Sequence, residues 1–361
     1  MFDIKRGKRL TVTNRIAGNR PLITAGYENM GVAGFISNDE QETFSSSTIT
    51  IDMFANTFYR NYKYSADDNI LVLLEKKGML EKSKMFITSV IHKCLKDKFS
   101  YGNQFRMGSF NKVNIRLPTS EIGKIDFDFM ESFIIALEKE KMIKLQTYLL
   151  VANLTDYTLT AKEQQVLDDF EQAEFREFKV TDIFDVNNSK SILSRDIIEN
   201  SGTTPYLCAS ADNNAISSYI AYDKQILDTG NCVFIGGKTF VVTYQEYDFY
   251  SNDSHNLILH LKNADKSKSN QLYLATCVKK GLSHKYSWGD SISNRKIQKD
   301  TISLPVKNKQ LDYAIMETLI SAIQKLVIKD VVLYTQAKTL SSDSDYANND
   351  SHKDSDQLCL L

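Results

Sequence analysis

Two kinds of hydrophobic pattern alternate along this chain of 361 residues. Short runs of β-branched and aromatic residues, separated by Gly, Asn, Asp and Ser, predict strands, most clearly at 233–235, 240–244 and 257–261. Gly230-Asn231 and Gly236-Gly237 predict turns between these runs. Longer stretches repeat their apolar residues at spacings of three and four, which is typical of amphipathic helices. The pattern therefore predicts an α/β protein with mixed, mostly antiparallel sheet.

Two of the helical stretches are long. One carries Phe129, Met130, Phe133, Ile134 and Leu137, and the other carries Ile315, Leu319, Ala322 and Leu326. We expect them to pack on each other as an antiparallel, coiled-coil-like pair, although each could instead pack only on its own domain. The predicted contacts are Phe133, Ile134, Leu137, Ile315, Leu319, Ile323 and Leu326. A shorter helix is predicted over 161–175, with Thr160 and Glu163 forming a capping box.

The chain also repeats itself. Seven matches occur in the same order at offsets between 182 and 187 residues, which indicates a duplication. The matches pair Phe2-Asp3-Ile4 with Phe184-Asp185-Val186, Pro21 with Pro205, Asn29 with Asn213, Tyr64 with Tyr250, Tyr101 with Tyr286, Leu117-Pro118 with Leu304-Pro305, and Met130-Glu131 with Met316-Glu317. We predict repeated domains at 1–118 and 173–305, helical segments at 119–172 and 306–340, and a disordered Ser- and Asp-rich tail at 341–361.

Composition narrows the class of protein. Hydrophobic residues make up 42% and charged residues 25%, as in an ordinary globular protein. We expect no membrane span and no signal peptide, and the five scattered cysteines indicate reduced thiols in a cytoplasm. His92 and Cys94 lack a second pair of ligands, so we expect no metal site.

Charge is distributed unevenly despite a formal net charge of −1. Residues 1–20 carry six basic side chains against Asp3 alone, and residues 93–116 carry six against Asp97 alone. Such local basic stretches suit phosphates, although solvated surface is an equally good explanation of the charge alone.

The motifs that would carry chemistry are incomplete. Gly236-Gly237-Lys238-Thr239 ends like a phosphate-binding loop, but Cys232 occupies the position of its first glycine, and a strand is predicted to follow. The sequence has no Pro-Pro for a base methyltransferase motif, no Gly-x-Ser-x-Gly elbow and no persuasive carboxylate set for a nuclease. We expect no catalytic residue in this chain.

The remaining candidates form a recognition surface of basic, amide and aromatic side chains near predicted loops, the types that contact phosphates and base edges. Ordinary loop surface is the alternative explanation for each of them. The predicted DNA contacts are Lys5, Arg6, Lys8, Arg9, Asn29, Arg60, Asn103, Gln104, Arg106, Asn213, Asn214, Lys238, Thr239, Tyr244, Gln245, His284, Lys285, Tyr286, Arg295 and Lys296.

A family resemblance rests on residues of the second repeat. Its pattern comprises 178–185, Pro205-Tyr206, Asn213-Asn214, Gly230-Asn231, Tyr244-Gln245, Phe249-Tyr250 with Asp253, Lys285-Tyr286-Ser287 and Leu304-Pro305. This pattern resembles a target recognition domain of the specificity subunit of type I restriction-modification enzymes. The first repeat resembles it more weakly, and nothing before Met1 corresponds to residues 175–183.

The resemblance implies a non-catalytic subunit with two recognition domains, each binding one half of a split site in double-stranded DNA. The long helices would set the distance between the halves. Methylation subunits bringing AdoMet, and restriction subunits using ATP and Mg, would dock on it. Two alternatives stay open: a duplicated protein-interaction scaffold without DNA affinity, and the specificity subunit of a related enzyme that cuts on both sides of its site.

Overall fold

A computed structural model describes residues 1–262 and 266–353, with side chains through residue 338. The chain forms two compact units, Met1–Thr147 and Tyr148–Leu361. Both are mixed α/β, and nearly all of their strand pairs are antiparallel, as the sequence predicted.

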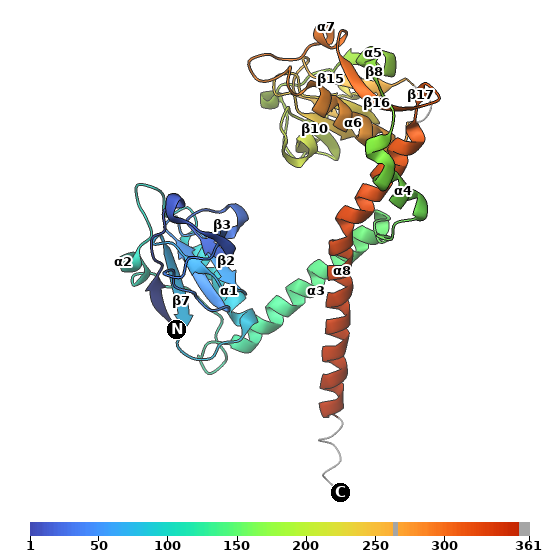
Figure 1. Ribbon diagram of the computed structural model, residues 1–361. Helices are drawn as coiled ribbons and strands as arrows, with labels where there is room; N and C mark the ends of the chain where they lie inside the picture. Colours follow the sequence, from blue (N-terminus) through green and yellow to red (C-terminus); the bar gives the residue numbers. More distant parts are fainter. Residues whose placement is uncertain (263–265, 354–361) are drawn as a thin grey trace. The chain divides into compact units, whose positions relative to one another are not determined.

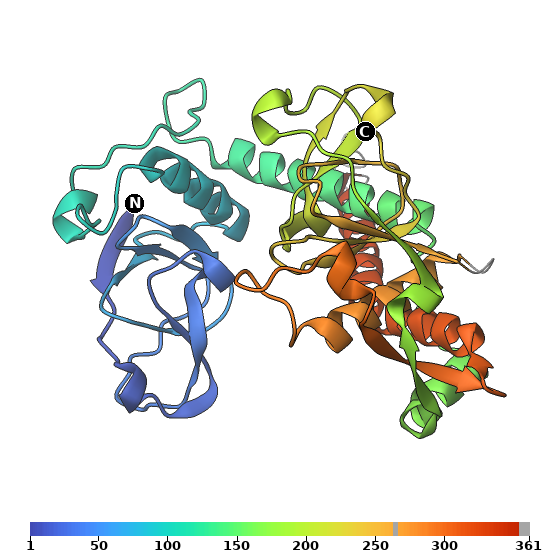
Figure 2. The ribbon, with the colours of Figure 1, turned by 90° about the horizontal axis from the view of Figure 1, so that it is seen from above.

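Unit 1 places a helix over one face of a four-stranded sheet. The sheet has the order β1 (Phe2–Arg6), β7 (Ile70–Glu75), β4 (Thr48–Asp52) and β5 (Thr57–Arg60). Helix α1 (Glu81–Leu95) packs against β4 and β5 (Figures 1 and 2). A smaller sheet comprises β3 (Val32–Ile36), β2 (Ala17–Ile23) and β6 (Ser65–Ala66). Helices α2 (Met107–Phe110) and α3 (Phe127–Val151) follow.

Alternate side chains of the central strands pack against α1 on one face of the large sheet and against the smaller sheet on the other. Ile49 and Leu73 belong to the same buried cluster as Ile87 and Ile91 of α1, whereas Val72 belongs to a second cluster with residues of the smaller sheet. Successive side chains of a strand point to opposite faces, so β7 is buried on both sides.

Unit 2 repeats this arrangement. Its large sheet has the order β13 (Val242–Gln245), β12 (Cys232–Ile235), β15 (Leu257–Leu261) and β9 (Phe184–Asn188). Its small sheet comprises β11 (Ile216–Ile220), β10 (Thr204–Leu207) and β14 (Tyr250–Ser251). Helix α6 (Lys268–Leu282) covers the large sheet, and α7 (Asn294–Ile297) matches α2 (Figure 1). Even the one parallel pairing recurs, as β2 with β6 and as β10 with β14. The predicted duplication is confirmed.

Pairing registers correct two of the sequence matches. Leu22 pairs with Ser65 and Tyr206 pairs with Tyr250, so the structural equivalent of Tyr64 is Phe249, one residue before the predicted Tyr250. The bridges Ser100–Asn103 and Ser287–Asp290 likewise make Trp288, and not Tyr286, the equivalent of Tyr101. The predicted matches followed residue identity, whereas backbone hydrogen bonds fix the register.

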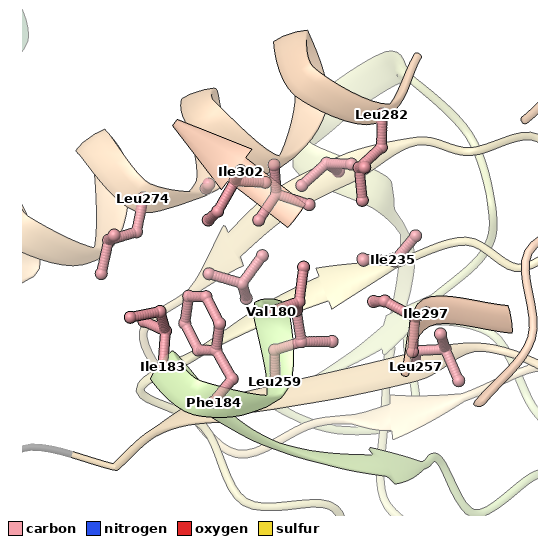
Figure 3. Close-up of a cluster of buried hydrophobic side chains, with 14 of the residues drawn as sticks. Val180, Ile183, Phe184, Ile235, Leu257, Leu259, Leu274, Leu282, Ile297 and Ile302 are labelled. Carbon is pink, nitrogen blue, oxygen red and sulfur yellow. The ribbon is translucent and has the colours of Figure 1, made fainter. Parts of the chain in front are cut away.

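A further segment completes the core of unit 2. Strand β8 (Phe175–Lys179) pairs with β16 (Thr301–Lys307), which also pairs with β17 (Gln310–Leu311). After β8, the single turn α5 (Val180–Ile183) inserts Val180 and Ile183 into the core beside Leu259 and Ile302 (Figure 3). In unit 1 an apolar cavity of about 200 Å³ lies between Phe2 and Ile115, the equivalents of Phe184 and Ile302.

The predicted helices form, with altered ends. Helix α4 (Ala161–Asp169) has the predicted capping box, but it stops before 175 because Phe175 begins β8. Helix α8 (Tyr313–Lys353) continues past residue 340 because no Pro or Gly interrupts it; residues 354–361 of the predicted tail lie outside the described residues. Phe240 has φ +53°, so β13 begins at Val242 and not at 240.

The regularly spaced apolar residues of α3 and α8 partly pack on their own units. Phe133 meets the ring of Phe86 on α1 edge to face at 5.6 Å, and Leu319 joins the core that Ile315 also touches. The other predicted pairing residues differ in exposure: Ile134 is buried, whereas Leu137, Ile323 and Leu326 are exposed. Packing within the same unit therefore explains the burial of part of each set of apolar residues. Pairing between the two helices stays a prediction, as do the predicted domain boundaries.

Candidate nucleic-acid interface

Each unit presents a left-handed turn in its small sheet. The turn comes immediately before β3 in unit 1 and immediately before β11 in unit 2. In unit 1, Asn29, Met30 and Gly31 have φ values of +48°, +54° and +78°. In unit 2, the equivalent residues Asn213, Asn214 and Ala215 have φ values of +47°, +53° and +67°. Consecutive left-handed residues other than glycine are costly and cluster at functional sites. The first two side chains of each turn are exposed, as expected for a contact surface.

A buried side chain supports each turn from the neighbouring strand. Arg60 donates from Nη2 to the Met30 carbonyl at 2.6 Å, and Gln245 donates from Nε2 to the Asn214 carbonyl at 2.9 Å. The two residues occupy equivalent places, since Arg60 pairs with Thr48 and Gln245 with Cys232.

Direct DNA contact does not fit Arg60 or Gln245, because only 1% and 3% of their surfaces are exposed. Arg60 also donates to Thr50 Oγ1 and to the Tyr62 hydroxyl, both at 3.0 Å. A sequence cannot show that these polar residues point inward. Both are positioning residues for the turns.

A groove of about 990 Å³ lies beside the turn of unit 2. Its walls include Thr204, Asn214, Tyr219, Tyr247 and Lys268. These side chains supply amide, hydroxyl, ammonium and aromatic groups, the mixture that contacts base edges and phosphates.

Tyr244 also lines this groove and donates its hydroxyl to Asn231 Oδ1 at 3.0 Å. Burial, reinforced by nearby Glu246, raises the pKa of Tyr244 to about 12. The phenol therefore stays protonated at neutral pH and acts as a hydrogen-bond donor. With 8% of its surface exposed, Tyr244 shapes the groove more than it offers contact.

The N-terminal basic residues are largely paired. Lys5 forms an ion pair with Glu42, Arg6 with Asp68 at 3.1 Å, and Lys8 donates to the Glu40 carbonyl at 3.0 Å. Arg9 is exposed. The acidic partners reduce the positive potential that the sequence predicted for this stretch.

Lys238 lies on the tight turn between β12 and β13. The turn closes with a hydrogen bond from Phe240 N to Gly236 O at 2.9 Å, and Thr239 donates to the Ala209 carbonyl at 2.8 Å. A strand follows it, which confirms that this is no phosphate-binding loop of the strand–loop–helix type. The side chain of Lys238 is 58% exposed, and its ammonium contacts the Asp253 carboxylate at 3.1 Å.

Asp253 is held ionised beneath this turn. Burial works against ionisation, but hydrogen bonds from His255 and Lys238 outweigh it and lower the pKa of Asp253 to about 2. The carboxylate therefore fixes Lys238 in place at neutral pH.

Some of the DNA contacts predicted before Leu117-Pro118 and Leu304-Pro305 already have hydrogen-bond partners, and others are exposed. Arg106 donates to Asn69 Oδ1 at 2.9 Å and to Gln104, and Asn103 donates to the Lys98 carbonyl at 3.2 Å. In unit 2, His284 and Arg295 are exposed.

Three further predicted contacts of unit 2 already have acidic partners. Asp300 accepts from Lys285 at 3.0 Å and from the Tyr286 hydroxyl at 2.5 Å, while Lys296 pairs with Asp290. Tyr286 is buried, so direct DNA contact does not fit it. Sequence reasoning selected Tyr286 and missed the exposed Trp288 beside it.

Net charge differs between the units. Unit 1 has 22 Lys and Arg against 17 Asp and Glu, whereas the remainder of the chain has 22 against 28. Phosphate attraction should therefore be stronger at unit 1.

Among the described residues no group of three or more His, Cys, Asp or Glu could hold a metal ion. None of the helices in that part of the chain combines the length and apolar character needed to cross a bilayer.

Comparison with known proteins gives consistent results. The family model described as "Type I restriction modification DNA specificity domain" matches residues 1–147 and again 172–333. One curated relative, the "Type II restriction enzyme BgcI specificity subunit S.BcgI" of Heyndrickxia coagulans, is 28% identical over 143 residues. That stretch covers 39% of this chain and 42% of the relative, so less than half of the relative's length is matched.

A solved structure shares the fold. The S subunit of a type I restriction-modification system from M. genitalium superimposes with a TM-score of 0.59 at 13% identity, covering 96% of this chain and 92% of that one. The likeness at this identity concerns fold. The boundaries of the two matched family regions agree with the duplication seen in the strand topology.

Proposed function

Because this chain belongs to the type I restriction modification DNA specificity family, we propose that it binds a two-part site in double-stranded DNA, one half per unit. The observation that carries the proposal is the left-handed turn, which recurs at the same place in both units. The scaffold supporting the turn is repeated, and its exposed residues differ at two of three positions: Glu28 and Met30 stand where Asp212 and Asn214 stand in the other unit, while Asn29 and Asn213 are identical. Different side chains on a common scaffold suit two different half-sites.

Chemistry in this proposal belongs to other subunits. The chain contributes binding and spacing, and it assembles with methylation and restriction subunits. AdoMet, ATP and Mg are bound by those partners. The solved structure it resembles is itself a subunit of a type I restriction-modification system, which supports a role within an assembly.

A second candidate differs only in the enzyme served. One relative is named as the specificity subunit of a type II restriction enzyme. The chain could therefore serve an enzyme of that type. Purifying the native complex separates the two cases: separate methylation and restriction polypeptides favour type I, and a single polypeptide carrying both activities favours the alternative.

The test of DNA binding is the salt dependence of affinity. The full chain should bind a fluorescein-labelled, mixed-sequence DNA duplex, and raising the salt from about 50 to 200 mM should weaken binding at least about tenfold, because phosphate contacts release counterions. Lys238→Ala should weaken binding and flatten the salt dependence. Lys144→Ala, which removes an exposed ion pair with Glu140 within α3, is the matched control. A folded chain with no affinity for the duplex at low salt would favour the protein-interaction scaffold.

A further inference from the structure

Two equivalent hairpins project from the units, and neither belongs to the left-handed turns. In unit 1, Ser100 and Asn103 exchange backbone hydrogen bonds of 3.0 and 3.1 Å around Tyr101 and Gly102. In unit 2, Ser287 and Asp290 exchange bonds of 3.2 and 3.1 Å around Trp288 and Gly289. Each hairpin therefore presents one aromatic residue and one glycine at its tip.

The aromatic rings are almost fully exposed. Tyr101 is 79% exposed and Trp288 is 76% exposed. A single exposed apolar side chain is common on proteins and requires no explanation. Here the same arrangement recurs at the same structural position in both units, as Ser100-Tyr101-Gly102-Asn103 and Ser287-Trp288-Gly289-Asp290. Burying such a ring against a partner would remove a large apolar area from water.

The adjacent glycines point to close approach from outside. A methyl group at Gly102 or Gly289 would have no described atom within 4 Å, and neither residue has a left-handed φ. Neither the packing of the chain nor its backbone conformation therefore requires glycine there. Glycine also permits an external surface to come close to the backbone, and that use remains available at both positions.

Charge around the hairpins indicates the kind of partner. Residues 93–116 carry six Lys and Arg against Asp97, and residues 279–300 carry six against Asp290 and Asp300, which are paired with Lys296 and Lys285. Aromatic side chains interleaved with basic ones favour nucleic acid, because an apolar side chain can pack against a base step or sugar of a duplex while the phosphates attract cations. The core of a protein–protein interface is instead depleted of charge.

We propose that Tyr101 and Trp288 are aromatic DNA contacts, one for each half-site, whose rings pack against a base or sugar while the neighbouring glycine admits the phosphate backbone. This inference rests on the proposed DNA binding and adds a contact outside the left-handed turns. Basic residues on either side of each hairpin hold the flanking phosphates.

Trp288 provides its own reporter, because it is the only tryptophan in the chain. Adding unlabelled mixed-sequence duplex to the full chain should quench and shift the Trp288 emission along the same titration curve as the anisotropy of labelled duplex. Trp288→Ala should weaken binding roughly tenfold, because the apolar area that the ring buries against the DNA is lost. Trp288→Phe should retain most of the affinity, and Tyr148→Ala, which removes another exposed ring, should retain all of it.

Unit 1 is tested by moving the reporter. In the Trp288→Phe background, Tyr101→Trp should restore DNA-dependent quenching. If the duplex binds with unchanged affinity to Trp288→Ala and leaves both emission signals unchanged, the inference is overturned while DNA binding stands. Emission that responds only to an added protein subunit also overturns it. A folded chain that binds no duplex overturns the proposed function together with the inference.

Discussion

Backbone strain and its support coincide at the left-handed turns. A left-handed conformation costs a residue other than glycine roughly 1–2 kcal/mol, so the strain must be offset by the surrounding structure. Arg60 and Gln245 provide part of the offset by donating to the carbonyls of Met30 and Asn214. Glycine at position 31 removes the steric cost there, whereas unit 2 has Ala215 at the equivalent place.

Gly31→Ala should destabilise unit 1. With φ at +78°, an added Cβ would lie 2.8 Å from the Thr24 carbonyl oxygen, so the free energy of unfolding should fall by about 2 kcal/mol. Urea unfolding of the full chain measures this change. Gly78→Ala is the control, because a methyl group there meets no described atom within 4 Å, and it should leave stability unchanged. Equal stability of both variants would mean that the turn is not left-handed in solution.

Single residues were predicted well where the signal is local. The sequence predicts Asn29, Asn213 and Asn214 as DNA contacts on loops, and the structure places them in left-handed turns, which asparagine tolerates. Arg60, Gln245 and Tyr286 were selected for their polarity, yet all three are buried. Their inward orientation depends on strand pairing between distant segments. Residue identity also matched Tyr101 with Tyr286, while the backbone register matches it with Trp288.

At the scale of elements, one carboxylate joins two helices of unit 2. Glu163 completes the capping box of α4 with Thr160, and it accepts hydrogen bonds from Ser321 at 2.6 Å and Lys325 at 3.0 Å on α8. Lys325 also pairs with Asp156 at 2.9 Å. The hydrogen bond from Ser321, followed by those from the Thr160 backbone and Lys325, lowers the pKa of Glu163 to about 2 despite burial.

Glu163→Gln should lower the free energy of unfolding by about 2 kcal/mol at neutral pH, because hydrogen bonds to a charged group are lost. Since the pKa of Glu163 is lowered on folding, its contribution is complete above about pH 4.5 and is lost as the pH falls toward 2. Urea unfolding between pH 7 and 3 should therefore show the difference between wild type and variant shrinking with acid. The exposed Glu171→Gln is the control. A difference independent of pH would contradict the network.

Sequence periodicity located most elements but not all of their ends. The capping box of α4 was predictable because its signal spans only four residues. The end of α4 was not, because it depends on Phe175 pairing with Pro305, 130 residues further along. The parallel pairing of β2 with β6 also joins distant residues, and no local sequence pattern predicts it. Helix α8 extends to Lys353 because nothing in its sequence stops it.

At the scale of the whole molecule, duplication and asymmetry occur together. The two units share strand order and the parallel pairing, yet Lys and Arg outnumber Asp and Glu in unit 1, whereas the reverse holds in the remainder of the chain. The sequence predicted the duplication because seven ordered matches share nearly one offset. Shared scaffolds with different exposed side chains are what two unequal half-sites would require.

The most direct measurement is a map of DNA methylation in a host that expresses this chain with its methylation subunit. The account predicts one new methylated motif made of two parts separated by a constant gap. Replacing the exposed residues Asp212, Asn213 and Asn214 with alanine should alter one part and leave the other unchanged. A continuous motif, or no new methylation from a soluble, assembled complex, would contradict the account.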